Sequence, residues 1–241
     1  MTSAPRTRKA KPLAARAPPG RASKARKRTP GRPAGDGPDL RARVLDAAIT
    51  CAVRQGVAAT SLRAIASEAH VTPALLHYYF GDKEQLVAAL VEERLMPAFA
   101  VVRDSAMGGG DVAGLVAGFV RGMSETVARH PWLPALWVRE VLCEGGALRE
   151  VVFNRLVPQM PLVLAQRFAA AQAQGQLNAE LDPRLLVISL IGLTLFPAAS
   201  APIWKRIFDA SDIDGDALRN HTLALLDRGL ALPASALKET A

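Results

Sequence analysis

At 241 residues, the chain is long enough to bury a sizeable core as one domain or two. Half of the residues are hydrophobic and 22% are charged, which is typical of a soluble globular protein and not of a fibrous one. The longest apolar run, residues 185–196, is interrupted by polar residues and is shorter than the ~20 residues of a membrane-spanning helix. Cys51 and Cys143 lie in helical patterns without metal-ligand spacing, so we expect buried thiols in a reducing cytoplasm, and not a disulfide or a metal site.

The net charge of +8 belongs almost wholly to the first segment. Residues 1–38 hold eleven Lys/Arg and one acid, whereas the rest of the chain holds 19 basic and 21 acidic residues. The segment also contains seven Pro, four Gly and no aromatic residue, so it cannot bury enough apolar surface to offset the entropy of ordering. We therefore expect a disordered basic tail over residues 1–38, and a short C-terminal tail over residues 233–241.

Within the basic tail, a Gly-Arg-Pro core follows a cluster of Lys and Arg. The pattern resembles an AT-hook, an extended segment that inserts Arg into a narrow A·T minor groove. The candidate residues of this minor-groove arm are Arg28, Gly31, Arg32 and Pro33. The usual hook has a basic residue where Pro30 stands. Non-specific attraction to phosphates and a purely solubilising tail are the alternatives.

The next part of the chain predicts three helices. Apolar residues recur at helical spacing over residues 39–55. Thr60 and Ser61 can cap a second helix, and Thr72 followed by Pro73 is typical of the N-terminus of a third. Two short helices joined by a three-residue turn, the second carrying polar aromatic residues, match a helix-turn-helix.

From Asp82 onward the pattern stays helical almost to the end. Asp82 is expected to cap a helix that Pro97 bends, and three glycines from Gly108 end it. The later predicted helices are Val112–Arg129, Trp132–Leu142, Ala147–Gln174, Pro183–Phe208 and Asp216–Leu230. No strand-like alternation is present in the sequence. We therefore predict an all-α fold with an N-terminal three-helix helix-turn-helix domain, residues 39–85, and a C-terminal helical domain, residues 86–232.

Residues 39–90 resemble the DNA-binding domain of the tetracycline-repressor (TetR) family of bacterial regulators. The residues that carry the resemblance are Arg43–Ala48, Gly56, Thr60–Ala66, Ala69, Val71–Thr72, Leu76, Tyr78–Phe80, Lys83 and Leu86. The resemblance covers about a fifth of the chain, and the rest agrees in being helical and of family-typical length. It implies a transcriptional regulator that binds a palindromic operator as a homodimer. It also implies a C-terminal domain that binds a small apolar inducer and forms the dimer interface.

The candidate DNA-binding residues follow from helix geometry together with this family pattern. Thr60, Ser61 and Thr72 lie at helix N-termini, where hydroxyl and free backbone N–H groups suit a phosphate, plain capping or both. The guanidinium of Arg63 matches guanine O6 and N7, and a phosphate contact is the alternative. Tyr78 either contacts DNA or packs against the turn.

Further candidates lie on the second helix of the motif. Pro73 and Ala74 can meet thymine methyl groups, and His77 can donate or accept at a base edge. The family usually has Tyr where His77 stands, so a solvent-exposed or intradomain His is the alternative. Tyr79 and Lys83 match the phosphate-contacting positions of the family.

In the C-terminal region, an aromatic and Met set at helical spacing indicates either an inducer cavity or an ordinary core. Its candidate ligand-binding members are Phe119, Met123, Trp132 and Trp137, with Arg121, Arg139, Glu140 and Asn154 as polar groups. By family analogy, the last two predicted helices pair with their copies as a four-helix interface. The candidates for that interface are Leu186, Leu190, Leu193, Leu223 and Leu226, with Gly192 allowing close approach.

An enzyme is not predicted, because the sequence has no Ser/His/Asp or Cys/His constellation, no Walker loop and no zinc spacing. We accordingly expect neither a cofactor nor a metal. The competing binding function is a non-specific DNA-coating protein dominated by the basic tail. An activator would use the same fold as a repressor. The expected location is the bacterial cytoplasm, on the nucleoid when the protein is bound to DNA, with no membrane partner.

Overall fold

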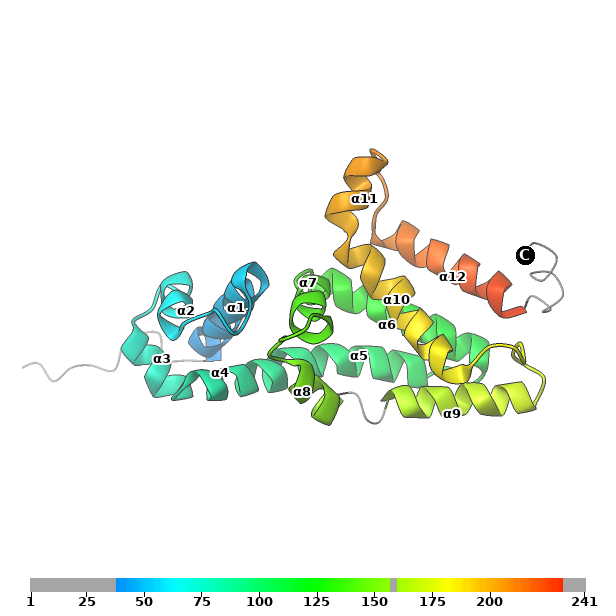
Figure 1. Ribbon diagram of the computed structural model, residues 1–241, viewed down its shortest axis with the longest axis horizontal. Coiled ribbons are helices and arrows are strands. Elements are labelled where there is room, and N and C mark those ends of the chain that lie inside the picture. The colour runs from blue at the N-terminus through cyan, green and yellow to red at the C-terminus, as the bar shows by residue number, and fades with distance from the viewer. Residues whose placement is uncertain (1–37, 157–159, 232–241) are drawn as a thin grey trace, which may run out of the picture. The chain divides into compact units, whose positions relative to one another are not determined.

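A computed structural model describes residues 38–156 and 160–231, which all belong to one compact unit, Gly37–Ala241. Every regular element in these residues is a helix, so the predicted all-α fold is confirmed (Figure 1). The candidate minor-groove arm, with Arg28, Gly31, Arg32 and Pro33, lies outside the described residues, as does the predicted C-terminal tail.

The first three helices form at the predicted positions. They are α1 (Pro38–Gln55), α2 (Leu62–Glu68) and α3 (Pro73–Phe80). The hydroxyl of Ser61 accepts a hydrogen bond from Ala64 N (3.1 Å), and that of Thr72 accepts one from Leu75 N (3.3 Å). These bonds satisfy backbone N–H groups that the first helical turn leaves unpaired, which fixes where α2 and α3 begin.

The next three elements run end to end as one long helical segment (Figure 1). They are α4 (Lys83–Leu90), the π-helical turn η1 (Val91–Leu95) and α5 (Met96–Met107). Asp82 caps α4 by accepting a hydrogen bond from Gln85 N (2.8 Å). Pro97 has no N–H for the carbonyl of Glu93 four residues earlier, and the side chain of Arg94 donates to that carbonyl instead (3.1 Å). The π turn η1 ends two residues before Pro97, where the sequence predicted a bend.

Helix α6 (Val112–Arg129) packs along α5 at very close range. Asp111 caps it by accepting a hydrogen bond from Gly114 N (2.7 Å). A Cβ atom added at Gly118 would overlap the carbonyl oxygen of Ser105, and one added at Gly122 would lie 3.0 Å from the Cα of Val102. The absence of side chains at these two positions thus permits the contact between the backbones. Helix α7 (Leu133–Trp137) and the π turn η2 (Val138–Leu142) follow.

Two predicted helices are each divided in the structure. The helix predicted over residues 147–174 is described as α8 (Arg149–Val151) with η3 (Val152–Leu156), and as α9 (Met160–Ala173). The helix predicted over residues 183–208 is wrong as a single element. It consists of α10 (Pro183–Ala199) and α11 (Ala201–Ile207), bent by 68°. Pro202 lacks the N–H that would continue α10, which explains the break at Ser200. The last helix is α12 (Gly215–Ala231).

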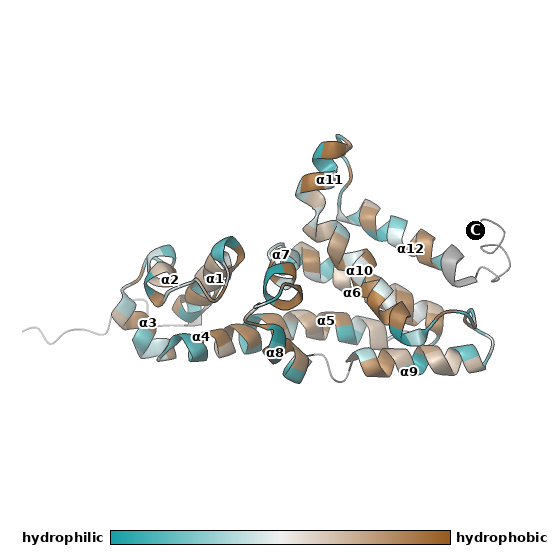
Figure 2. Ribbon diagram, viewed as in Figure 1, coloured by the Kyte–Doolittle hydropathy of each residue, from teal (hydrophilic) through white to brown (hydrophobic). Residues whose placement is uncertain are grey.

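Two hydrophobic clusters hold these helices together. The first cluster contains residues of α1, α2, α3, α4 and α7, together with Leu148 and Val152. The second cluster contains residues of α5, α6, α9 and α10, together with Leu226 of α12. Helix α10 is apolar along most of its length (Figure 2). No single helix in residues 38–156 and 160–231 is long and apolar enough to cross a membrane, and the bent pair α10–α11 reaches that length only jointly.

Candidate DNA-binding surface

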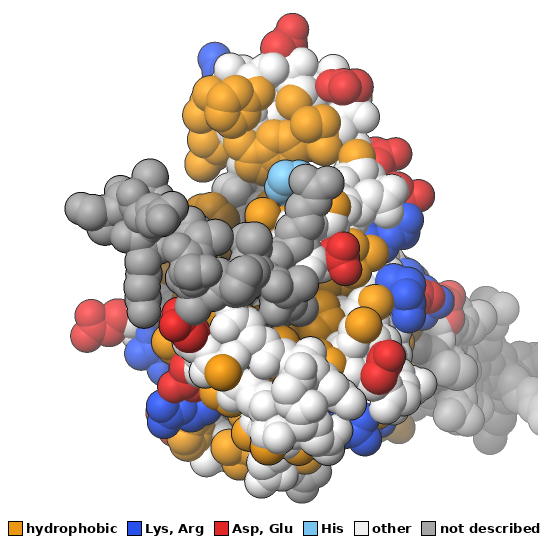
Figure 3. All heavy atoms as spheres, turned by 90° about the vertical axis from the view of Figure 1, so that its right-hand side faces the viewer, with side chains coloured by type: hydrophobic (Ala, Val, Ile, Leu, Met, Phe, Trp, Pro, Cys, Tyr) orange, Lys and Arg blue, Asp and Glu red, His pale blue; other side chains and the backbone are white. Residues whose placement is uncertain are grey.

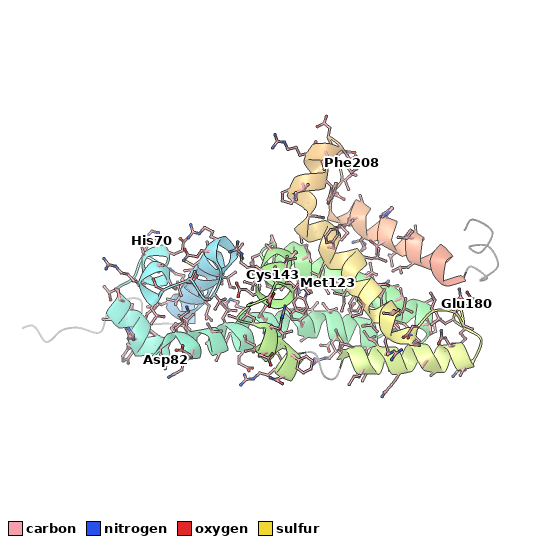
Figure 4. The ribbon with its side chains drawn as sticks, viewed as in Figure 1. His70, Asp82, Met123, Cys143, Glu180 and Phe208 are labelled. Carbon is pink, nitrogen blue, oxygen red and sulfur yellow. The ribbon has the colours of Figure 1, made fainter. Side chains whose placement is uncertain are left out.

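Helix α3 has one solvent-facing side and one core-facing side. Figure 4 labels His70 in the turn before it and Asp82 just after it, and these residues bracket the helix. The exposed side consists of Pro73, Ala74, His77 and Tyr78, and the buried side of Leu76 and Phe80. Four of the five sequence-predicted residues of α3 therefore share a single outward face, as a helix that reads a DNA groove requires, and Tyr79 is half-buried.

Arg41 of α1 fixes the end of α3. Its guanidinium lies 4.5 Å from the centre of the Phe80 ring, and one of its nitrogens donates to the carbonyl oxygen of Tyr79 (3.4 Å). The same guanidinium forms a bidentate ion pair with Glu93 of η1, with Nε–Oε1 and Nη2–Oε1 distances of 2.9 and 2.6 Å. Hydrogen bonding to Glu93 raises the pKa of Arg41. This Arg is thus committed to holding α3, and its charge is already neutralised.

Most Arg side chains around the motif have intradomain partners. Arg43 donates to the carbonyl oxygen of Ala69 (2.9 Å), and Arg54 forms an ion pair with Glu68. Arg63, in the first turn of α2, is exposed and has no hydrogen-bond partner within the described part of the chain. Its guanidinium is therefore free to contact an external acceptor.

His77 has an intradomain role that one of the sequence alternatives anticipated. Its Nδ1 lies 2.6 Å from the carbonyl oxygen of Gly81, the residue that ends α3 with a φ of +75°. The Nδ1–H tautomer donates to this carbonyl and leaves Nε2 as the remaining polar atom of the ring. A base contact by His77 would therefore use Nε2.

The two tyrosines differ in their surroundings. Tyr78 is 79% exposed, so it does not pack against the turn. Its ring lies edge-on to that of Tyr79, with centres 5.4 Å apart. Tyr79 is half-buried and packs against the first hydrophobic cluster.

Thr60 is not part of this surface. Its side chain is 3% exposed, and its hydroxyl donates to the carbonyl oxygen of Gly56 (2.7 Å). Ser61, one residue later, is the N-cap of α2 and is exposed. A phosphate contact through the Thr60 hydroxyl would require this corner to open, so we remove Thr60 from the candidate set and retain Ser61 and Thr72.

The structure does not bring the four candidate ligand-binding residues together. Phe119 and Met123, the latter labelled in Figure 4, are buried in the second hydrophobic cluster. Trp132 packs against the first cluster, and Trp137 packs against both. Phe119 and Met123 are therefore core residues in this state of the protein, and Trp137 is the candidate that the structure favours.

Trp137 borders a narrow apolar slot. The slot is too narrow to admit a water molecule. The residues that line it are Leu95, Leu133, Leu136, Trp137, Val141, Leu148 and Val152. Each of the three π turns contributes one lining residue to the slot. A π-helix is rare in proteins and often marks a functional site. The buried Nε1–H of Trp137 has no acceptor within the described residues. Periodicity alone does not reveal such a slot.

The candidate dimer residues differ in burial within their own chain: Leu193 and Leu223 are partly buried, and Gly192 is exposed. Leu186, Leu190 and Leu226 are buried in the second cluster of their own chain. The outward stripe of α10 consists instead of Leu185, Ile188, Gly192 and Phe196. Figure 3 shows further hydrophobic side chains gathered at its top, over α11, where Ile203, Ile207 and the labelled Phe208 of Figure 4 are exposed. An unpaired apolar surface therefore runs along α10 and α11.

No group of three or more His, Cys, Asp or Glu that could hold a metal ion occurs among residues 38–156 and 160–231.

Comparisons with known proteins agree on the N-terminal part. Residues 44–90 match the model of the family described as "Bacterial regulatory proteins, tetR family". The HTH-type transcriptional regulator BetI of Rhizobium meliloti (strain 1021) is 43% identical over 58 residues, which are 24% of this chain and 29% of that protein. The chain thus matches less than a third of the length of this curated relative.

Solved structures resemble almost the whole fold. The ketosteroid transcriptional regulator KstR2 of Mycobacterium tuberculosis superposes with a TM-score of 0.66 at 20% identity, covering 83% of this chain and 98% of that one. The regulator FadR of Bacillus subtilis, solved in complex with stearoyl-CoA, gives a TM-score of 0.60 at 20% identity, with 78% and 98% covered. At 20% identity, these similarities show a shared fold and nothing more.

Proposed function

We propose that this chain is a transcriptional regulator of the TetR family and not an enzyme, and that it is a sequence-specific repressor whose hold on DNA is relieved by a small apolar ligand. In this proposal, residues 39–85 bind DNA and residues 86–232 bind the ligand and form a homodimer. The protein would act in the cytoplasm, on the DNA.

The observation that carries the proposal is the outward face of α3 beside the unpaired Arg63. The exposed residues of α3 form one stripe, and α1 and η1 hold the helix rigidly through Arg41. Residues 39–85 contain five Lys/Arg and five Asp/Glu, so bulk charge does not attract this region to DNA. Apart from the attraction that the basic tail adds, the affinity of this region must then come from a few well-placed contacts, which favours sequence-specific binding by the helix-turn-helix.

A second copy of the chain is the partner that we propose for the outward stripe of α10. Leu185, Ile188 and Phe196 are each more than 60% exposed, and a Cβ added at Gly192 would meet no atom within 4 Å. A symmetric dimer would bury this stripe against its own copy. Its two α3 helices would then enter successive major grooves, about 34 Å apart, on a palindromic operator.

The ligand site that we propose is the slot beside Trp137. Its lining is apolar, as a site for a small apolar ligand requires. The Bacillus subtilis neighbour holds an acyl thioester, stearoyl-CoA, which is consistent with an apolar ligand for a fold of this kind. Because the slot is closed to water, a ligand would have to widen it, and this would favour a state with lower affinity for DNA.

Selection from random double-stranded DNA by the full chain tests the proposal. We expect the selected pool to converge on a palindrome whose half-sites are one helical turn apart, or a multiple of one turn. Competition at physiological salt should then favour this sequence over random DNA by at least ~10³-fold. A ratio near one would identify a non-specific DNA-coating protein and overturn the proposal. Transcription from a promoter that carries the palindrome distinguishes a repressor from an activator.

A further inference from the structure

Glu140 is the only acidic or basic side chain that is buried among the described residues. It lies in the π turn η2 and is 3% exposed. A buried carboxylate is costly unless hydrogen bonds replace its lost hydration. The partners of this carboxylate therefore indicate what its burial achieves.

The two carboxylate oxygens bind two different parts of the chain. Oε1 accepts a hydrogen bond from Val57 N (3.0 Å), which lies between α1 and α2, 83 positions earlier in the sequence. Oε2 accepts one from Ala147 N (3.1 Å), in the loop after η2. Glu140 thus joins the helix-turn-helix region directly to the segment that follows α7.

The residues that receive Glu140 form a tight corner, Gly56–Thr60. Gly56 has a φ of +89°, and a Cβ atom there would lie 3.2 Å from Glu140 Oε1, so the close approach favours Gly. Thr60 closes the corner through its bonds to the carbonyl oxygen of Gly56. Lys83 donates to the carbonyl oxygen of Ala58. The corner therefore connects Glu140 to the first residue of α4.

The other side of η2 reaches the apolar slot. Val141 lines the slot directly after Glu140, and Trp137 lines it immediately before η2. Residues that line the slot, Trp137 and Val141, therefore lie within three positions of the residue that holds the corner, Glu140. Movement of η2 would act on both the slot and the corner.

We infer that Glu140 is a positioning residue that sets the placement of the helix-turn-helix relative to the C-terminal helices, and that a ligand in the slot acts on DNA binding through it. The part that concerns DNA rests on the proposed function. Loss of the carboxylate frees Val57 N and loosens the corner while leaving the face of α3 intact. The base preference within each half-site then stays the same, and the tolerance for different half-site spacings increases.

Amide hydrogen exchange of the full chain tests the contact without DNA. The variants are Glu140→Gln, which keeps the size of the side chain, and Glu140→Ala, which removes both acceptors. Glu125→Gln is the matched control, because Glu125 is an exposed carboxylate paired with Arg129 on α6. We expect exchange at Val57 to be about tenfold faster or more in Glu140→Ala, with a smaller rise in Glu140→Gln and none in the control. Unchanged exchange at Val57, or an equal rise throughout α9, would overturn the inference.

DNA selection with Glu140→Gln provides a readout that a merely structural role would not move. Palindromes selected by the wild-type chain are rebuilt with one base pair added between their half-sites. We expect the wild type to bind the lengthened palindrome more weakly than the selected one. In Glu140→Gln, the ratio of these two affinities should be at least several-fold smaller. Equal discrimination by both proteins contradicts the inference. If the wild type selects no sequence, the proposed function fails, and hydrogen exchange still decides whether Glu140 holds the corner.

Discussion

The ammonium group of Lys83, at the first residue of α4, donates a 2.7 Å hydrogen bond to the carbonyl oxygen of Ala58. Lysine has three N–H donors, so two remain for a phosphate. The bond to Ala58 holds the ammonium in place before DNA arrives, which reduces the entropy lost on contact.

We therefore expect Lys83→Ala to weaken binding to all DNA sequences about equally. The slope of log K against log[salt] should become shallower by ~1, as for the loss of one phosphate contact. Fluorescence anisotropy titrations at four salt concentrations measure both effects. Arg103→Ala, which removes a positive charge from α5, is the control and should leave the slope unchanged. A change in the preferred sequence would contradict the assigned phosphate contact.

Arg63→Ala should relax sequence preference. Its exposed guanidinium is free of partners in the described residues, and a bidentate contact with guanine discriminates by about 1–3 kcal/mol. Competition between the selected operator and single-base variants measures this discrimination. Arg54→Ala is the matched control, since Arg54 already pairs with Glu68. A uniform loss of affinity for all variants would show that Arg63 contacts a phosphate.

Ile188→Arg should break the dimer. A charged side chain in the apolar stripe of α10 would have to be buried against its copy, weakening association by about 2 kcal/mol or more. Sedimentation velocity over a range of concentrations measures the change. Leu162→Arg on α9 is a close control, because Leu162 is 63% exposed and Ile188 62%. Equal behaviour of the two variants would place the interface elsewhere.

Gly118→Ala should destabilise the fold by about 1–3 kcal/mol or more, because the added methyl group overlaps the backbone of α5 at Ser105. Gly192→Ala on α10 adds the same group in open space and should stabilise the isolated chain by about 0.5–1 kcal/mol. Urea unfolding at low protein concentration compares the two variants. Similar free energies of unfolding for both would contradict the close packing of α5 on α6.

Acidification should destabilise the protein through His130. Burial, with a further contribution from Arg129, lowers the pKa of His130 below its usual value of 6.5. Its neutral form is therefore favoured by folding, and its contribution to stability is present above pH 6.5 and decreases as the pH falls toward the lowered pKa. His130→Gln should flatten the pH dependence of the free energy of unfolding between pH 7.5 and 5.5, which urea unfolding at a series of pH values measures. An unchanged pH dependence in His130→Gln would contradict this assignment.

Local chemistry made the helix-turn-helix predictable. The Thr72-Pro73 pair fixes the start of α3 through groups within one turn, and Asp82 does the same for α4. Such signals depend on neighbours in the sequence, so a single sequence is sufficient. The resemblance to a known family then identified which exposed residues of α3 to examine.

Features that depend on distant parts of the chain were not predictable in the same way. Ser61 and Thr60 are adjacent hydroxyl residues, and only the folded corner decides that Thr60 is the buried one. Helix α10 carries large apolar residues on both its buried and its exposed side, so its sequence does not indicate that Leu186 faces inward and Leu185 outward. Glu140 was expected to belong to a ligand cavity, but its carboxylate binds Val57, a partner that no local pattern indicates.

The π turn η1 determines where the helical segment formed by α4, η1 and α5 tolerates a change in length. A π turn holds one residue more than the α-helical turn it replaces, here seen in the bond from Met96 N to Val91 O. Deleting one residue within Val91–Leu95 would convert η1 to α-helix and keep α4 and α5 in their present rotational phase. The same deletion inside α4 or α5 would rotate everything beyond it by about 100° and turn the core-facing residues toward solvent. Single-residue deletions are therefore best accommodated at η1.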